Sequence, residues 1–162
     1  MRTIKFKAKR INNGDWVVGS LAIHGKRAYI LPEENIGLPL AVFEKVAPTT
    51  VCQFTGFLDK NGKEIYEGDV LRSDSYPYSC FEDIERDNYF AVVFYCEDGA
   101  SFATVTVNNP ESNVGGIADG ICNDVWREEM KRFEVVGNIH EEKWQQYGEY
   151  FKTEEGKEAD ND

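Results

Sequence analysis

The chain has 162 residues and a mass of 18.5 kDa, and 41% of its residues are hydrophobic, so it is long enough for about one domain with a real core. No apolar run approaches the ~18–20 residues of a membrane span, and the charged residues 1–10 lack the apolar stretch of a signal peptide. We therefore expect a cytoplasmic protein without a membrane contact.

The charge balance is acidic, with 18 basic and 29 acidic residues and a net charge of −11. Residues 1–10 carry five positive charges and no acid, and most of the acidity lies in the body of the chain, not in the last ten residues. A negative field repels phosphate backbones, which disfavours direct nucleic-acid binding. A solvated surface explains the acidity, and a surface that imitates nucleic acid or docks on a basic partner is the alternative.

The chemistry-bearing residues form no pattern typical of an enzyme or a metal site. The four cysteines, Cys52, Cys80, Cys96 and Cys122, include no C-x-x-C pair, and zinc sites need closely spaced ligands. His24 falls in an expected turn and His140 at the end of an expected strand, so we interpret both as structural. Phosphate-binding glycine loops and hydrolase elbows are absent from the sequence. We therefore expect no metal, no cofactor and no catalytic residue.

The first half of the chain is predicted to form strands. Apolar and basic residues alternate over 4–9, which predicts an edge strand whose lysines face solvent. Further strands are expected at 16–23, 27–31 and 40–46, with a loop at 33–39. Aromatic and basic residues interleave near this first strand, a pattern that could suit stacking on single-stranded nucleic acid, although the acidic remainder argues against it.

The middle of the chain is rich in turn signals. Asn61-Gly62 stands between two apolar segments and predicts the turn of a β-hairpin. Gly68-Asp69 predicts a tight turn or bulge that leads into another strand. Glu67 and Asp69 flank that glycine, and a backbone-bonding role for Asp69 is the simplest interpretation of the pair.

The second half mixes strands with less regular segments. Residues 73–88 are expected to be a loop with a short helix at 80–88, and residues 89–95 a strand buried on both faces. A strand at 100–107, a long loop at 108–120, a helical turn within 124–132 and a last strand at 133–139 follow. The pattern predicts a mainly β fold, a small antiparallel barrel or sandwich-like domain with one or two short helices.

Three segments resemble the YopX family of phage and prophage proteins. The central run, residues 53–70 (QFTGFLDKNGKEIYEGDV), resembles the family signature, and residues 1–8 and 133–141 resemble its opening and its ending. The likeness spans 1–142, with variable insertions near 73–88 and 108–131, and Cys52 stands where a glycine is more usual. Residues 143–162 are expected to be a short amphipathic segment and a disordered acidic tail. The signature residues, which we interpret as structural, are Gln53, Phe54, Thr55, Gly56, Asp59, Asn61, Gly62, Ile65, Tyr66, Glu67, Gly68, Asp69, Gly137, Asn138 and Ile139.

The resemblance implies a mainly β protein encoded in phage genomes, located in the cytoplasm of a bacterial host, with no established activity and no catalytic residues to carry over. The leading hypothesis is a non-enzymatic accessory protein that binds a phage or host protein or forms a homo-oligomer. An acidic nucleic-acid mimic and an unrecognised enzyme are the alternatives.

Self-association is predicted from aromatic residues outside the obvious strands, which would leave apolar patches on the surface. The last of them have helical spacing and could instead pack on their own domain. These aromatic residues are Tyr76, Tyr78, Phe81, Trp144, Tyr147, Tyr150 and Phe151.

Overall fold

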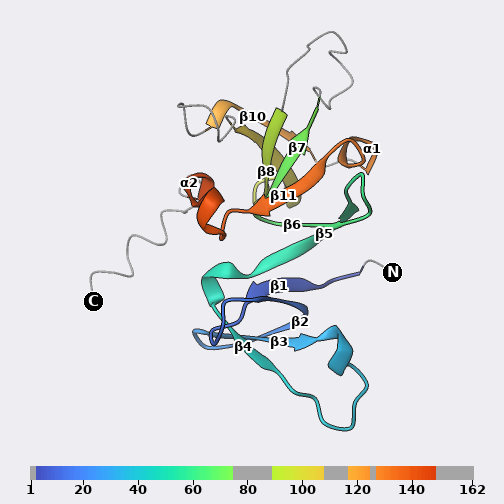
Figure 1. The fold of residues 1–162 in the computed structure, drawn as a ribbon, viewed down its shortest axis with the longest axis vertical. Coiled ribbons are helices and arrows are strands. Elements are labelled where there is room, and N and C mark those ends of the chain that lie inside the picture. Colours follow the sequence, from blue (N-terminus) through green and yellow to red (C-terminus); the bar gives the residue numbers. More distant parts are fainter. Residues whose placement is uncertain (1–2, 75–88, 108–116, 125–126, 149–162) are drawn as a thin grey trace, which may run out of the picture. The chain divides into compact units, whose positions relative to one another are not determined.

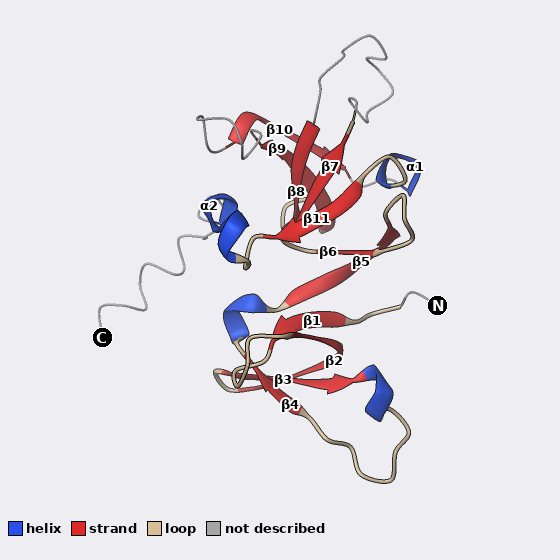
Figure 2. Ribbon diagram, in the orientation of Figure 1, coloured by secondary structure: helices blue, strands red, loops and turns tan. Residues whose placement is uncertain are grey.

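The fold of the chain is mainly β, as the sequence predicts. The computed structural model describes residues 3–74, 89–107, 117–124 and 127–148, and in this part of the chain the strands form two antiparallel sheets (Figures 1 and 2). The chain divides into two compact units. Unit 1 comprises Met1–Phe57 and Glu64–Glu67, and unit 2 comprises Leu58–Lys63 and Gly68–Asp162.

The sheet of unit 1 has six strands in the order β4-β3-β2-β1-β5-β6. Two short 3-10 helices, η1 and η2, precede and follow the β4 strand. The elements are β1 (Phe6–Lys9), β2 (Trp16–His24), β3 (Arg27–Pro32), η1 (Glu33–Asn35), β4 (Glu44–Val46), η2 (Pro48–Thr50), β5 (Cys52–Leu58) and β6 (Glu64–Tyr66).

Strands β1 to β4 curl into a small barrel. The backbone just after β1 returns to β4 through a bridge between Arg10 and Val46, and the Ala47 amide donates to the Lys9 carbonyl at 2.9 Å. The barrel interior is filled by side chains of modest size, all at most 3% exposed: Ala8, Val17, Ala28, Ile30 and Val46. Alternation along each strand directs these residues inward.

The position of β1 corrects one prediction. This strand is not an edge strand, because it pairs with β2 on one side and with β5 on the other. Lys7 and Lys9 on this strand are half-buried, and the side chain of Lys5, just before it, is only 13% exposed. Period-two alternation shows which residues share a face, but it does not show how many neighbours the strand has.

The predicted fourth strand is also shorter than expected. The sequence predicts residues 40–46, whereas β4 contains only Glu44–Val46, and residues 36–43 form an exposed loop. Gly37, at φ +87°, and Pro39 interrupt an extended conformation there, and the apolar side chains that indicate a strand find no partner strand.

The sheet of unit 2 has five strands in the order β10-β9-β8-β7-β11. Its strands and helices are β7 (Asp69–Ser73), β8 (Tyr89–Cys96), β9 (Ser101–Val107), β10 (Ile117–Asp124), α1 (Arg127–Met130), β11 (Glu134–Asn138), η3 (Glu142–Trp144) and α2 (Gln145–Gly148). The predicted loop at 108–120 is thus wrong over 117–120, which belongs to β10. The register shift between Ile117 and Cys122 accommodates Gly120, one of the glycines that favour a loop in the sequence.

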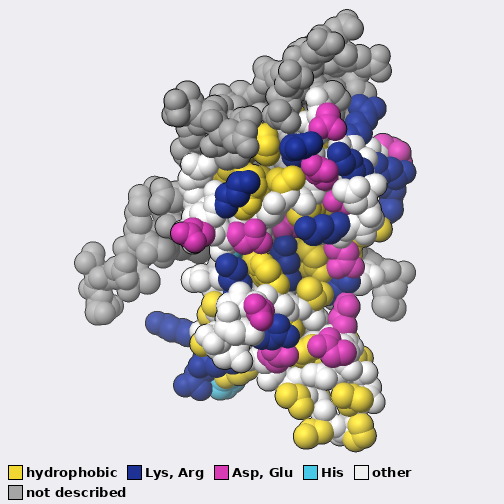
Figure 3. Space-filling view, in the orientation of Figure 1, with side chains coloured by type: hydrophobic (Ala, Val, Ile, Leu, Met, Phe, Trp, Pro, Cys, Tyr) yellow, Lys and Arg dark blue, Asp and Glu magenta, His cyan; other side chains and the backbone are white. Residues whose placement is uncertain are grey.

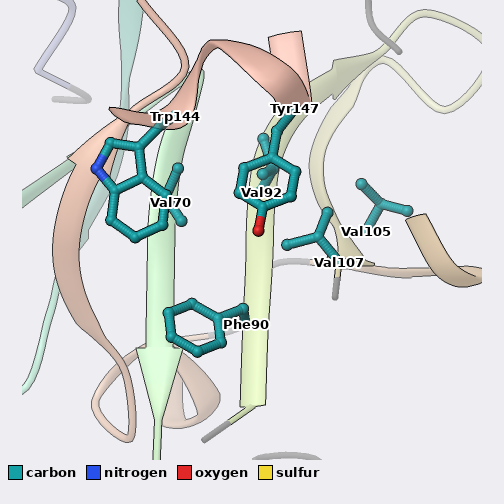
Figure 4. Packing of buried hydrophobic residues seen from close by; sticks show 7 residues of the cluster. All are labelled: Val70, Phe90, Val92, Val105, Val107, Trp144 and Tyr147. Carbon is teal, nitrogen blue, oxygen red and sulfur yellow. The ribbon is translucent and has the colours of Figure 1, made fainter. Parts of the chain in front are cut away.

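One face of this sheet is covered by η3 and α2. Val70, Val92 and Val105 lie opposite one another on β7, β8 and β9, and Trp144 and Tyr147 pack over them (Figure 4). The ring centroids of Trp144 and Phe90 are 6.3 Å apart. Burial of these large aromatic side chains makes a major contribution to the stability of unit 2.

Strand β8 is buried on both faces over residues 89–93, as predicted, whereas Tyr95, which the prediction includes, is 42% exposed. Tyr89 and Ala91 point to the face opposite the Trp144 cluster, and Tyr89 contacts Phe133, which follows α1, with ring centroids 6.0 Å apart. Trp144 and Tyr147 are 3% and 0% exposed, so these two aromatics pack within their own unit. The predicted helix at 80–88, the acidic tail and the other aromatics proposed as a contact surface, at 76, 78, 81, 150 and 151, lie outside the described residues.

Candidate functional site

Asp59, in the hairpin turn between β5 and β6, binds backbone amides. One carboxylate oxygen accepts hydrogen bonds from the amides of Asn61 (2.8 Å) and Lys63 (2.9 Å), and the other accepts one from Val135 on β11 (2.9 Å). The Gly62 amide closes the turn by donating to the Asp59 carbonyl. The same carboxylate therefore accepts hydrogen bonds from two amides of the turn and from one amide of β11, and so connects the turn to that strand.

A second cluster of signature residues surrounds Gly68. The Asn138 side chain donates to the fully buried Asp69 carboxylate at 2.9 Å, and its own oxygen accepts the His140 amide. Gly68 has φ +74°, and a Cβ atom there would lie 3.1 Å from the Ile139 side chain. This position therefore favours glycine on both conformational and steric grounds.

Gly137 is required by a close contact with Trp144. A Cβ atom at this position would lie 2.0 Å from the Trp144 indole nitrogen. Gly56 has φ +92°. The other signature residues make backbone or ring contacts: the Thr55 hydroxyl donates to the Ile65 carbonyl at 2.8 Å, and Phe54 lies against Tyr66 with ring centroids 5.5 Å apart. In the backbone, the Glu67 amide donates to the Gln53 carbonyl and the Ile139 amide to the Gly68 carbonyl.

Glu67 is the first of the two acids that flank Gly68. Burial raises its pKa, and a hydrogen bond from the Gln53 backbone partly opposes that effect. The Asp69 carboxylate, on the other side of Gly68, instead accepts a hydrogen bond from the Asn138 side chain.

The alternating lysines on and just before β1 lie over aromatic rings. Lys7 Nζ is 4.9 Å from the Trp16 ring centroid and 4.8 Å from that of Tyr66, and Lys5 Nζ is 5.2 Å from that of Phe54. Lys5 also forms ion pairs with Glu33 and Glu64. A base that stacked on one of these rings would compete with the ammonium group that lies over it. The arrangement stabilises the sheet by cation–π contacts.

The cysteines and histidines do not converge in the described part of the chain. Cys52 is buried and Cys96 half-buried, both as free thiols, and no group of three potential metal ligands occurs among the described residues. Cys80 is outside the described residues, and Cys122 lies on β10. Within the same described ranges, no helix is long and apolar enough to cross a membrane.

The candidate functional site is the segment between η1 and β4, residues 36–43, which we call the apolar loop. Its eight residues are all exposed and include no polar side chain. The lower end of unit 1 in Figure 3 shows these apolar side chains facing solvent. Five large side chains are 46–75% exposed: Ile36, Leu38, Leu40, Val42 and Phe43. Sequence reasoning missed this site because it places residues 40–43 in a strand and gives the loop expected at 33–39 no binding role.

Hydrogen bonds close the apolar loop at its base. The Asn35 side chain donates to the Val42 carbonyl at 3.3 Å, and the Leu38 amide donates to the Asn35 carbonyl at 3.3 Å. After the loop, Glu44 forms an ion pair with Arg10, whose Nη1 also donates to the Trp16 carbonyl at 3.0 Å. The base of the loop is thus anchored to the barrel.

A hollow of about 280 Å³ lies beside the end of the apolar loop, lined by Ile11, Asn12, Glu44 and Lys45. Ile11 is 55% exposed. Glu44, on the wall of the hollow, is paired with Arg10. The hydrogen bond from Arg10 holds the pKa of the Glu44 carboxyl below its ordinary value.

The two units differ in charge. Unit 1 contains 8 basic and 6 acidic residues, a net charge of +2, whereas unit 2 contains 10 basic and 23 acidic residues, a net charge of −13. Several described carboxylates of unit 2 have internal partners: Glu134 pairs with Lys60 and Arg72, and Glu128 with Lys131.

Comparison with known proteins gives one informative match. None of the curated proteins compared with the chain matches it. In the crystal structure of protein EF1440 from Enterococcus faecalis, 95% of that chain aligns with 86% of this one at 18% sequence identity and a TM-score of 0.47. The family model described as YopX protein matches residues 5–143, which include both sheets and every signature residue. The chain belongs to the YopX family.

Proposed function

We propose that this protein is a non-enzymatic binding protein that recognises a protein partner through the apolar loop. Membership of the YopX family suggests a phage-associated protein of unclear role. The observation that carries the proposal is the unbroken exposure of residues 36–43.

The apolar surface is concentrated on this loop. Ten large apolar side chains are exposed in the described part of the chain, and five of them belong to residues 36–43. Scattered apolar residues are ordinary on protein surfaces, but contiguous patches mark interaction sites. Burying one such side chain against a partner contributes about 1.5–3 kcal/mol.

The surroundings of the loop favour a protein partner. Glu33 before the loop and Glu44 after it are paired with Lys5 and Arg10, and residues 36–43 carry no charge. The loop therefore offers no cationic group to an anionic lipid or a phosphate, and its apolar side chains suit an apolar surface on a protein. The hydrogen bonds at the loop base hold the backbone, so less conformational entropy is lost when a partner binds.

Site-specific photo-crosslinking tests this proposal. A photoreactive phenylalanine analogue is placed at Leu40 in the full chain, expressed in bacteria, and irradiated in the cell. The matched control carries the same analogue at Lys26, an exposed residue in the turn between β2 and β3. We expect a discrete protein adduct from position 40 and not from position 26. The absence of an adduct at 40, or equal adducts at both positions, would contradict the proposal.

A further inference from the structure

We propose that the protein bound by the apolar loop is a second copy of this chain, and that each loop occupies the hollow beside Ile11 on the other copy. The inference rests on the proposed function and adds the identity of the partner and of the receiving surface. The symmetry of such a contact, the size of the hollow and the distribution of charge all support it.

The hollow has the size of a side-chain receptor. Its volume of about 280 Å³ is at the lower limit of the ~300–1,000 Å³ of pockets for small-molecule ligands, and it therefore suits one or two aliphatic side chains. The exposed Ile11 offers an apolar wall. Glu44 is already paired with Arg10, so covering this wall leaves no unpaired carboxylate.

The position of the hollow meets the condition for a two-fold contact. In a symmetric dimer the same patch is used on both copies, so a protruding group and its receptor must belong to one patch. The apolar loop ends at Phe43, and the next two residues, Glu44 and Lys45, line the hollow. Donor and receptor are therefore neighbours on the same barrel.

The charge distribution selects unit 1 as the surface where two copies meet. Two identical chains of net charge −11 repel each other. Unit 2 carries −13 and unit 1 carries +2, so a contact through the uncharged loop on unit 1 brings together the least repulsive parts of the two chains.

A charge-exchange experiment tests the contact. Light scattering during size exclusion measures the mass of full-length wild type and of the variants Leu40→Lys and Ile11→Glu. We expect the wild type at micromolar concentration to have about twice the 18.5 kDa mass of one chain, and each variant to dimerise roughly 10–100-fold more weakly. An equimolar mixture of the two variants should recover the dimer, because one contact then pairs the introduced lysine with the introduced glutamate and the other contact keeps both native residues.

The control is Ile23→Lys, which changes an isoleucine that is 61% exposed at the end of β2. It should leave the dimer unchanged, and circular dichroism should show the same β content for all variants. A monomeric wild type, an Ile11→Glu variant that dimerises normally, or a mixture that stays monomeric would each overturn the inference. An adduct from position 40 to a different protein would overturn it too, while the proposed function would stand.

Discussion

The two units place their apolar side chains differently. In unit 2 the large aromatics Phe90, Trp144 and Tyr147 lie inside, because η3 and α2 cover one face of the sheet. In unit 1 the barrel interior is filled by alanine, valine and isoleucine, while eight of the ten exposed large apolar side chains of the described residues lie on its outside.

The two units therefore differ in where their apolar side chains lie and in how much charge they carry. Unit 2 uses its aromatic residues for its own core and carries most of the negative charge. Unit 1 is nearly neutral and leaves an apolar segment exposed, the segment that we propose as a binding surface. The signature residues serve mainly the backbone contacts that build each unit, whereas the candidate binding surface lies outside the signature.

The largest effect expected is that of Trp144→Ala. Removing this side chain leaves a cavity over β7 and β8, and we expect the free energy of unfolding to fall by about 3–5 kcal/mol. The matched variant Trp16→Ala removes a half-buried ring on the outside of the unit 1 barrel and should cost less. Urea denaturation followed by circular dichroism measures both. An equal or larger loss for Trp16→Ala would break the comparison between the units.

A smaller effect is expected for Gly137→Ala. The added methyl group would overlap the Trp144 indole, so the ring or β11 must shift, at a cost of about 1–3 kcal/mol. Gly148→Ala is the control, because its Cβ atom would lie 3.5 Å from Ile139, an ordinary contact. Thermal unfolding of both variants tests this prediction. Equal melting temperatures would show that the Trp144 side chain does not prevent a larger residue at position 137.

The smallest effect is expected for Glu44→Gln at the base of the apolar loop. The Arg10 hydrogen bond lowers the pKa of Glu44 from its ordinary value of 4.5. The stabilisation is therefore fully present above that value and is lost as the pH falls through the lower pKa of the folded state. At neutral pH we expect a loss below about 1 kcal/mol for this partly exposed pair.

Urea midpoints measured at a series of pH values test this prediction. The difference between wild type and Glu44→Gln should shrink as the solution becomes acidic. Glu34→Gln, at an exposed acid of η1, serves as the control and should follow the wild type throughout. A difference that grows in acid would contradict the assigned role of Arg10.

The sequence predicted the fold better than it predicted the site. Alternation and turn signals located most strands, and Asn61-Gly62 indicated the hairpin turn correctly. Neighbour relations could not be predicted, because the pattern of β1 is the same for an edge strand and for an interior strand whose lysines cover aromatic rings. The apolar loop was missed for a related reason: residues 40–43 have strand-like composition but no partner strand.

The distribution of unit 1 and unit 2 along the chain has a consequence during synthesis. All strands of unit 1 have been translated by Tyr66, whereas the core of unit 2 is incomplete until Tyr147 has been added. At the usual ~5–20 residues per second, the ribosome needs roughly 4–16 s for that interval. A nascent chain can therefore carry a finished barrel, with the apolar loop exposed on it, while the core of unit 2 is still incomplete on the ribosome.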